Sequence, residues 1–122
     1  MIFNAVEEIL QLSLDAFVHN DLTAARYVEP LEQVIDELKE TLRTRHILRL
    51  QQGECTISAG FIWSDLLTNL ERISDHCSNI AGCVFDVAHN NMNLHETLKN
   101  VRNNSVEYNQ DYKKYKELYL LP

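Results

Sequence analysis

The sequence predicts an all-α fold, an up-down three-helix bundle followed by one or two short C-terminal helices. The 122 residues include only three Gly and two Pro, whereas turn-rich β proteins need many of both. Apolar residues recur three and four positions apart over long stretches, which is the period of an amphipathic helix. Because the chain has the length of one domain and 45% hydrophobic residues, we expect residues 1–122 to form a single domain with its own core.

The first helix is predicted over residues 2–19. Its apolar residues share one stripe, and Glu7 and Glu8 lie on the opposite face. The members of this stripe are Phe3, Val6, Leu10, Leu14 and Phe17. Asn20 tolerates the left-handed conformation that ends helices, and Asp21 is a good N-cap for the next helix. We therefore expect the apolar stripe to face the core.

The second helix is predicted over residues 22–52, with Gly53 ending it. Its apolar seam consists of Val28, Leu31, Ile35, Leu38 and Leu42. Pro30 is the one irregularity, because a proline either lies in the first turn of a helix or kinks a helix that began earlier. We favour a helix that begins near Asp21 and is kinked at Pro30.

The third helix is predicted over residues 56–88, with Thr56 or Ser58 as its N-cap. Its apolar positions alternate four and three apart, as a helix packed along an antiparallel neighbour requires. They are Leu66, Leu70, Ile73, Cys77, Ile80, Val84 and Val87. The short connections between the three helices favour an up-down-up arrangement around one core.

A C-terminal appendage is predicted over residues 94–119. The Asn-rich segment 89–93 predicts a break, because Asn competes for backbone hydrogen bonds. A short helix is expected over Leu94–Val101, and Ser105 can cap a last one. That last helix carries Tyr108, Tyr112, Tyr115 and Tyr119 on one face. These tyrosines could form a ligand cage, but we favour a terminal helix half-buried on the bundle, since tyrosine combines an apolar ring with a hydroxyl that accepts water.

Charge and composition exclude several partners. The net charge of −7 and the pI of about 5.1 argue against nucleic acid, which requires a basic surface. No apolar run approaches the ~18 residues needed to cross a bilayer, and the first residues lack the features of a signal peptide. Three cysteines without a Cys-x-x-Cys pair fit a reducing compartment. We therefore expect a cytoplasmic protein without direct membrane insertion.

Acidic residues form a stripe on each of the two long helices. The stripe on the 22–52 helix consists of Glu29, Glu32, Asp36 and Glu40, placed off the apolar seam. On the 56–88 helix, Glu71 and Asp75 lie one turn apart on the outward face. If the two stripes lie side by side, Glu32, Asp36, Glu71 and Asp75 gather four carboxylates, which repel one another unless protons, arginines or metal ions neutralise them.

Two interpretations of these stripes remain open. Solvated acids paired with Arg26, Lys39 or Arg72 are the ordinary condition of a helix surface. Alternatively, oxygen ligands suit a hard or borderline metal cation, and His46 or His76 could add a nitrogen ligand. A lone His beside a seam is more often a packed residue than a ligand.

The sequence argues against an enzyme. The three glycines are too scattered for a phosphate-binding loop, and the Glu-x-x-His element of di-iron bundles is missing. Cys77 and His76 project about 100° apart on a helix, which disfavours a thiol nucleophile. A metal-dependent hydrolase that uses the acidic residues would need a general base and a pocket, and neither is evident.

Residues 70–81 read LERISDHCSNIA, which resembles the Glu-Arg-Ile-x-Asp-His-x-x-Asn-Ile motif of the PhoU family. The stretches 46–55 and 60–61 are similar to the PhoU-like domain attached to bacterial sodium/phosphate cotransporters. The closing segment 112–122 looks like the end of that protein. The resemblance covers most of the chain and is strongest over residues 29–83.

The resemblance implies a bundle of three-helix repeats that regulates phosphate uptake negatively, through a transporter or a sensor kinase. It implies iron or zinc on outer acidic motifs, at positions that correspond to Glu32, Asp36, Glu71 and Asp75. Glu29 and His76 are further candidates. Members of the family have two repeats, so the single repeat here implies the second half of a larger cytoplasmic domain. The implied partner is a membrane transporter portion of the same or another chain. As a fragment, the chain is expected to cover its exposed face by forming a homodimer. The alternative is a structural helical interaction module that binds neither metal nor ligand.

Overall fold

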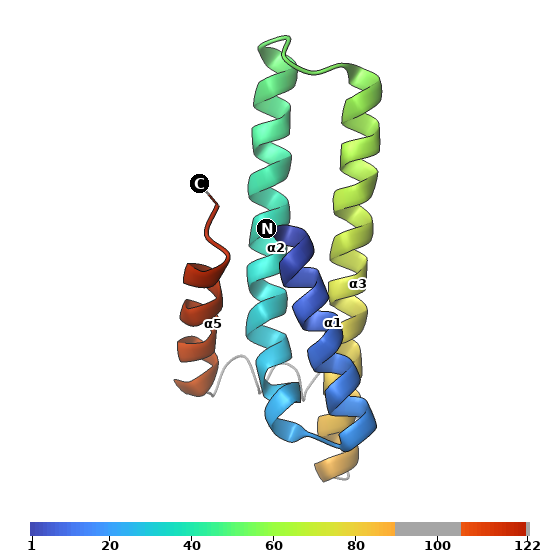
Figure 1. The fold of residues 1–122 in the computed structure, drawn as a ribbon, viewed down its shortest axis with the longest axis vertical. Helices are drawn as coiled ribbons and strands as arrows, with labels where there is room; N and C mark the ends of the chain where they lie inside the picture. The colour runs from blue at the N-terminus through green and yellow to red at the C-terminus, as the bar shows by residue number, and fades with distance from the viewer. Residues whose placement is uncertain (90–105, 122) are drawn as a thin grey trace.

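The computed structural model describes residues 1–89 and 106–121, and this part of the chain contains four helices (Figure 1). They are α1 (Ile2–His19), α2 (Leu22–Gln51), α3 (Ile57–His89) and α5 (Val106–Leu118). The long helices α2 and α3 lie side by side, and α1 lies along their lower half in contact with both. Helix α5 packs on α2. The all-α prediction is therefore confirmed, and the three predicted long helices are present.

Local signals set the helix boundaries close to where the sequence predicts them. Asn20 adopts a left-handed conformation with φ of 50° after α1, and the Asp21 side chain accepts hydrogen bonds from the amides of Thr23 and Ala24 at 3.0 and 3.2 Å. At the start of α3, the Thr56 hydroxyl accepts the amide of Ala59 at 3.1 Å. Such bonds satisfy amides that have no partner within the helix.

The helix boundaries do not test every prediction about the helices. Pro30 lies inside α2, so the helix begins before the proline as predicted, while the kink stays a prediction. The Asn-rich break at 90–93, the short helix Leu94–Val101 and the cap at Ser105 lie outside the described residues.

The core lies where α1, α2 and α3 meet, and α2 contributes most to it. Its predicted seam is confirmed, because Val28, Leu31 and Ile35 are fully buried and Leu38 nearly so. Helix α2 contacts α1, α3 and α5, and it lies between α5 and α3 in Figure 1. Its first half therefore has few exposed positions, and this burial extends to Glu29 and Glu32.

Helix α1 packs on a different face from the predicted one. Its buried residues are Ile2, Ala5, Val6, Ile9, Ser13 and Ala16. Of the predicted stripe only Val6 is buried, while Phe3, Leu10, Leu14 and Phe17 are exposed. The buried face combines three small residues, which allow the backbone of α1 to approach both long helices closely, with Ile2, Val6 and Ile9. Both phenylalanines remain outside.

The seam of α3 is also rotated from the predicted one. Leu70, Cys77 and Val84 are buried as predicted, but Ile73 is 39% exposed and Val87 is 75% exposed. In their place Leu67, Ser74, Ser78 and Ala81 are buried. Helix α3 has two neighbours, so its buried surface is wider than a single two-helix seam.

Within residues 1–89 and 106–121, no helix combines the length and the apolar character that a bilayer crossing requires.

Candidate functional site

The predicted acidic stripe of α2 is divided between the interior and the surface. Glu29 is fully buried and Glu32 is nearly so, which contradicts their predicted position on an outer face. The Ser78 hydroxyl of α3 donates a hydrogen bond to Glu29. The contacts of α2 with three other helices explain the difference, because a position off the predicted seam still meets a neighbour.

Asp36 and Glu40 stay near the surface and surround Lys39. The Lys39 ammonium lies 3.1 Å from Asp36 Oδ1 and 3.4 Å from Glu40 Oε1. Burial lowers the pKa of Lys39, but its hydrogen bond to Asp36 and the charges of Asp36 and Glu71 outweigh that effect, so its pKa is raised. Lys39 therefore remains a cation on α2, paired with Asp36 and Glu40.

The α3 residues of the predicted metal site differ in exposure. Glu71 is half-buried, whereas Asp75 and His76 are exposed. In the part of the chain that the structure describes, no three His, Cys, Asp or Glu side chains converge as a metal site. The residues implied by the resemblance therefore do not fit a metal in this arrangement, and metal binding stays a prediction.

His46 is a packed residue, as the ordinary interpretation of a lone His beside a seam expects. It is buried between α2 and α3. A Cβ added to Gly60 would lie only 2.6 Å from His46 Nε2, so the glycine makes room for the imidazole. His46 of α2 and Gly60 of α3 are therefore closely packed against each other.

Helix α5 is attached to α2 by ion pairs at its start and by tyrosines further along. Arg26 lies 3.3 Å from Glu107 and 3.5 Å from Asp111. Tyr115 and Tyr119 are buried, and the Tyr119 hydroxyl donates to Glu8 of α1 at 3.3 Å. The tyrosine face is therefore packed against the bundle, which confirms the half-buried terminal helix.

Alkaline pH is expected to loosen this attachment. Burial, together with the charge of Glu8, raises the pKa of Tyr115, and the same causes raise the pKa of Tyr119 to about 12. An unfolded tyrosine titrates near pH 10, so between about pH 10 and 12 the folded protein holds protons that the unfolded chain has lost. Stability is then complete below about pH 10 and falls as the pH rises, by up to about 1.4 kcal/mol per pH unit for each tyrosine.

Ultraviolet absorbance of tyrosinate and urea unfolding at several pH values would measure this effect. Tyr119→Phe, which keeps the ring but cannot ionise, should make the fall in stability less steep. Titration of all five tyrosines together near pH 10 would contradict the expectation.

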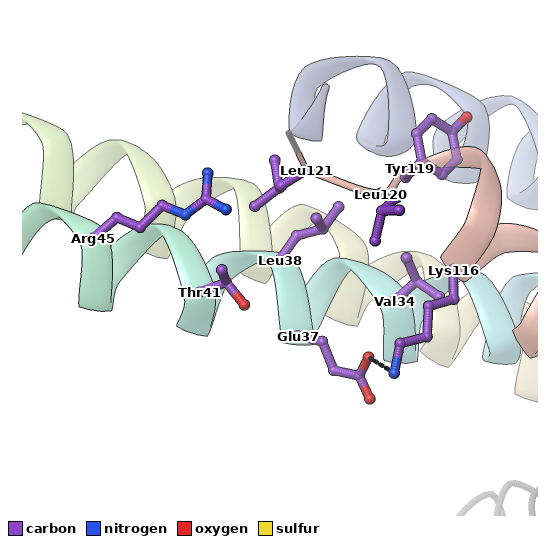
Figure 2. A pocket seen from close by; sticks show the side chains of 9 residues that line it. All are labelled: Val34, Glu37, Leu38, Thr41, Arg45, Lys116, Tyr119, Leu120 and Leu121. Carbon is purple, nitrogen blue, oxygen red and sulfur yellow. Dashed lines mark ion pairs between the residues drawn. The ribbon is translucent and has the colours of Figure 1, made fainter.

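A groove of about 180 Å³ lies between α2 and the C-terminal segment 119–121 (Figure 2). The surface that lines it is mostly apolar, and Leu38 and Leu121 lie along its length. Figure 2 shows Arg45 at one end and the ion pair between Glu37 and Lys116, 3.8 Å apart, at the other. The groove depends on the packing of the C-terminal segment against α2, which periodicity does not predict.

The outer surface of α1 continues onto α3 as an apolar face. We define this face by Phe3, Leu10, Leu14 and Phe17 of α1 with Cys83 and Val87 of α3; all six side chains are exposed. Phe17, Cys83 and Val87 also line a hollow of about 320 Å³. Contiguous exposed apolar side chains of this kind mark interaction surfaces in soluble domains. In the sequence, the α1 part of this face is visible as the apolar stripe of residues 2–19, which we expected to face the core.

Two comparisons with known proteins name the same family. The family model described as "PhoU domain" matches residues 2–84. The "Phosphate-specific transport system accessory protein PhoU homolog 1" of Thermotoga maritima is 25% identical over 103 residues, which cover 84% of this chain and 44% of that protein. An "Uncharacterized protein" of Deinococcus radiodurans is 32% identical over 81 residues, which cover 62% of this chain and 28% of that protein. No solved structure matches.

The chain thus spans less than half the length of either curated relative. The family match takes in α1, α2 and most of α3, and it ends before α5.

Proposed function

The chain belongs to the PhoU domain family, and from that premise we propose that it is a non-enzymatic regulatory domain of phosphate transport. The T. maritima relative is named as an accessory protein of a phosphate-specific transport system. The feature of this chain that best supports a regulatory role is the apolar face of α1 and α3, because a domain that acts through a partner needs a surface on which to bind it.

We further propose that the partner is a membrane transporter portion, in the same chain or in another, and that the domain lies at its cytoplasmic side. The resemblance of residues 46–55 and 112–122 to the domain of bacterial sodium/phosphate cotransporters supports this more specific assignment. An acidic surface disfavours adsorption to anionic lipid, so recruitment to the membrane would depend on the transporter itself.

A second copy of the chain is proposed to cover the apolar face. The chain spans 44% of the T. maritima relative, so two copies have about the length of that protein. Two three-helix units that pair through α1 and α3 would bury the six apolar side chains and form a six-helix unit. The hollow beside Phe17 and Val87 offers space for a side chain of the second copy.

Phosphate uptake by whole cells tests the regulatory proposal. In the organism that carries the gene, in-frame deletion of the codons for residues 1–122, with any other coding sequence left intact, should raise uptake of radiolabelled phosphate in phosphate-rich medium. Uptake should rise because the domain is proposed to inhibit the transporter, and its removal abolishes that inhibition. Expression of residues 1–122 should lower uptake again.

Re-expression of residues 1–122 with Leu118→Lys serves as a control, because Leu118 lies on α5, outside the family match. This variant should lower phosphate uptake as well as the wild-type domain does. Unchanged uptake after the deletion would contradict the regulatory function and favour the structural interaction module.

A further inference from the structure

Helix α5 is attached mainly to one helix of the bundle. Among the described helices, α2 is the only one with which α5 makes extensive contact, and within α5 only Asp111 and Tyr115 are buried. By contrast, α1, α2 and α3 each contact both of the others. Detachment of α5 would therefore leave the contacts among the other three helices in place.

Two of the ion pairs that hold α5 lie near the surface. Glu107 and Lys116 are 63% and 57% exposed, and they pair with Arg26 at 3.3 Å and with Glu37 at 3.8 Å. Exposed ion pairs contribute little to stability, because water and salt screen the charges. These two pairs therefore orient α5 more than they stabilise it.

The more buried ion pair of α5 is poorly compensated. The Asp111 side chain is 12% exposed, and its Oδ2 atom lies 3.5 Å from Nε of Arg26. Neither atom has a hydrogen-bond partner among the described residues. Burial raises the pKa of Asp111, although the charge of Arg26 acts to lower it. Because a buried charge with incomplete compensation costs free energy, this pair offsets part of the stability that the packed tyrosines provide.

An apolar part of α2 lies beneath the C-terminal segment. Val34 and Leu38 are buried, and both line the groove in Figure 2, whose lining residues all come from α2 and residues 116–121. On this side, the C-terminal segment is therefore what covers Val34 and Leu38. Movement of the segment away from α2 would expose them.

We propose that α5 and residues 119–121 form a strap that opens as one unit while α1, α2 and α3 stay packed together, and that this strap controls access to Val34 and Leu38. Proteins open locally in cooperative units, and the units of lowest stability have few buried contacts. The strap combines a single main neighbour, exposed ion pairs and a poorly compensated buried charge. Its opening goes beyond the proposed regulatory function and does not depend on it.

Thiol labelling of Val34→Cys tests whether the strap opens separately. Val34 and the native Cys77 are each 2% exposed, but Cys77 belongs to α3 and to the core of the bundle, so it serves as the control in the same molecule. N-ethylmaleimide would be added under native conditions, and the label at each cysteine would be followed by mass spectrometry. We expect the Val34→Cys thiol to react at least about 100-fold faster than Cys77. If Val34→Cys does not fold, Leu38→Cys is used in the same way.

Substitutions at the attachment locate the opening. Arg26→Gln removes both ion pairs at the start of α5 and leaves Asp111 without its ion-pair partner, so the Val34→Cys thiol should react roughly tenfold faster. Adding Asp111→Asn should reverse most of this increase, because a neutral amide costs less to bury than a carboxylate. Arg72→Gln makes the same chemical change at an exposed position of α3 and should leave the rate unchanged.

Faster reaction of the Val34→Cys thiol than of Cys77, with a further increase in Arg26→Gln alone, supports the strap. Equal rates at the two thiols would overturn the proposal, because access to Val34 would then require unfolding of the whole bundle. A rate that does not respond to Arg26→Gln, or that responds equally to Arg72→Gln, would also overturn it, because the opening would then not be the detachment of α5.

Discussion

The double variant Phe17→Lys/Val87→Lys is expected to sediment as a monomer at concentrations at which the proposed wild-type dimer would form. Phe17 and Val87 are 68% and 75% exposed in the single chain, and both line the hollow on the apolar face. Burial of a large apolar side chain contributes about 1.5–3 kcal/mol, and an unpaired ammonium in an apolar interface costs several kcal/mol more. The dissociation constant should therefore rise by at least about 100-fold, since each 1.4 kcal/mol is a factor of ten.

The two substitutions should leave the fold of each protomer intact. Both positions lie in the last turns of their helices, Phe17 in α1 and Val87 in α3. A cation interacts favourably with the carbonyl groups at the end of a helix, so lysine is better tolerated at these sites than aspartate. Circular dichroism of the variant should match that of the wild type, which separates loss of pairing from loss of folding.

Leu118→Lys provides the matched control, because Leu118 is 56% exposed and is the last residue of α5. It carries the same chemical change to the end of a helix that is not part of the apolar face. We expect its sedimentation to equal that of the wild type over the full range of concentration. A wild-type protein that stays monomeric at high concentration would rule out the homodimer, and equal dissociation of both variants would show that the apolar face is not the contact.

The helix positions could be predicted because their determinants are local. Asp21 caps α2, Thr56 caps α3, and Asn20 ends α1, and each of these effects depends on residues within a few positions along the chain. The three-four period of the apolar residues predicted the length of each helix. None of these signals contains information about how a helix is rotated about its axis relative to its neighbours.

That rotation is what the sequence could not predict. Helix α1 has two apolar stripes, and the stripe with the larger side chains, including Phe3 and Phe17, was assigned to the core. The structure buries the stripe that contains Ala5 and Ala16. Side-chain size favoured the first assignment, whereas close approach of three helices favours small residues at the contact. Only the contact of α1 with both α2 and α3 distinguishes the buried stripe from the exposed one.

The acidic residues show the same limit. Spacing along α2 correctly placed Asp36 and Glu40 on one surface and identified Lys39 as a candidate partner. It could not show that α2 meets three other helices, and this is why Glu29 and Glu32 are buried. A stripe that is continuous along the sequence is therefore divided in space, and the part left near the surface surrounds a lysine.

The largest loss of stability is expected from Leu67→Ala, and its comparison with Leu66→Ala tests the rotation of α3 directly. The sequence assigned Leu66 to the apolar seam, whereas the structure buries Leu67 almost completely and Leu66 only in part. Truncation of a fully buried leucine leaves a cavity and costs about 3–5 kcal/mol, whereas a half-buried one costs roughly 1–2 kcal/mol. Both variants remove the same atoms from adjacent positions of α3, so the change in helix propensity is the same in each and cancels in the comparison.

Urea unfolding at a single protein concentration would measure both free energies of unfolding, because the proposed pairing of two copies would make stability depend on concentration. We expect the midpoint of Leu67→Ala to fall well below that of Leu66→Ala, with similar slopes. Since the slope reports the surface exposed on unfolding, similar slopes would mean that the difference comes from packing in the native core. A greater loss from Leu66→Ala would instead restore the seam predicted from periodicity, and with it an outward position for Ser74 and Ser78. The apolar face would then lose Val87, because the same rotation would carry that side chain inward.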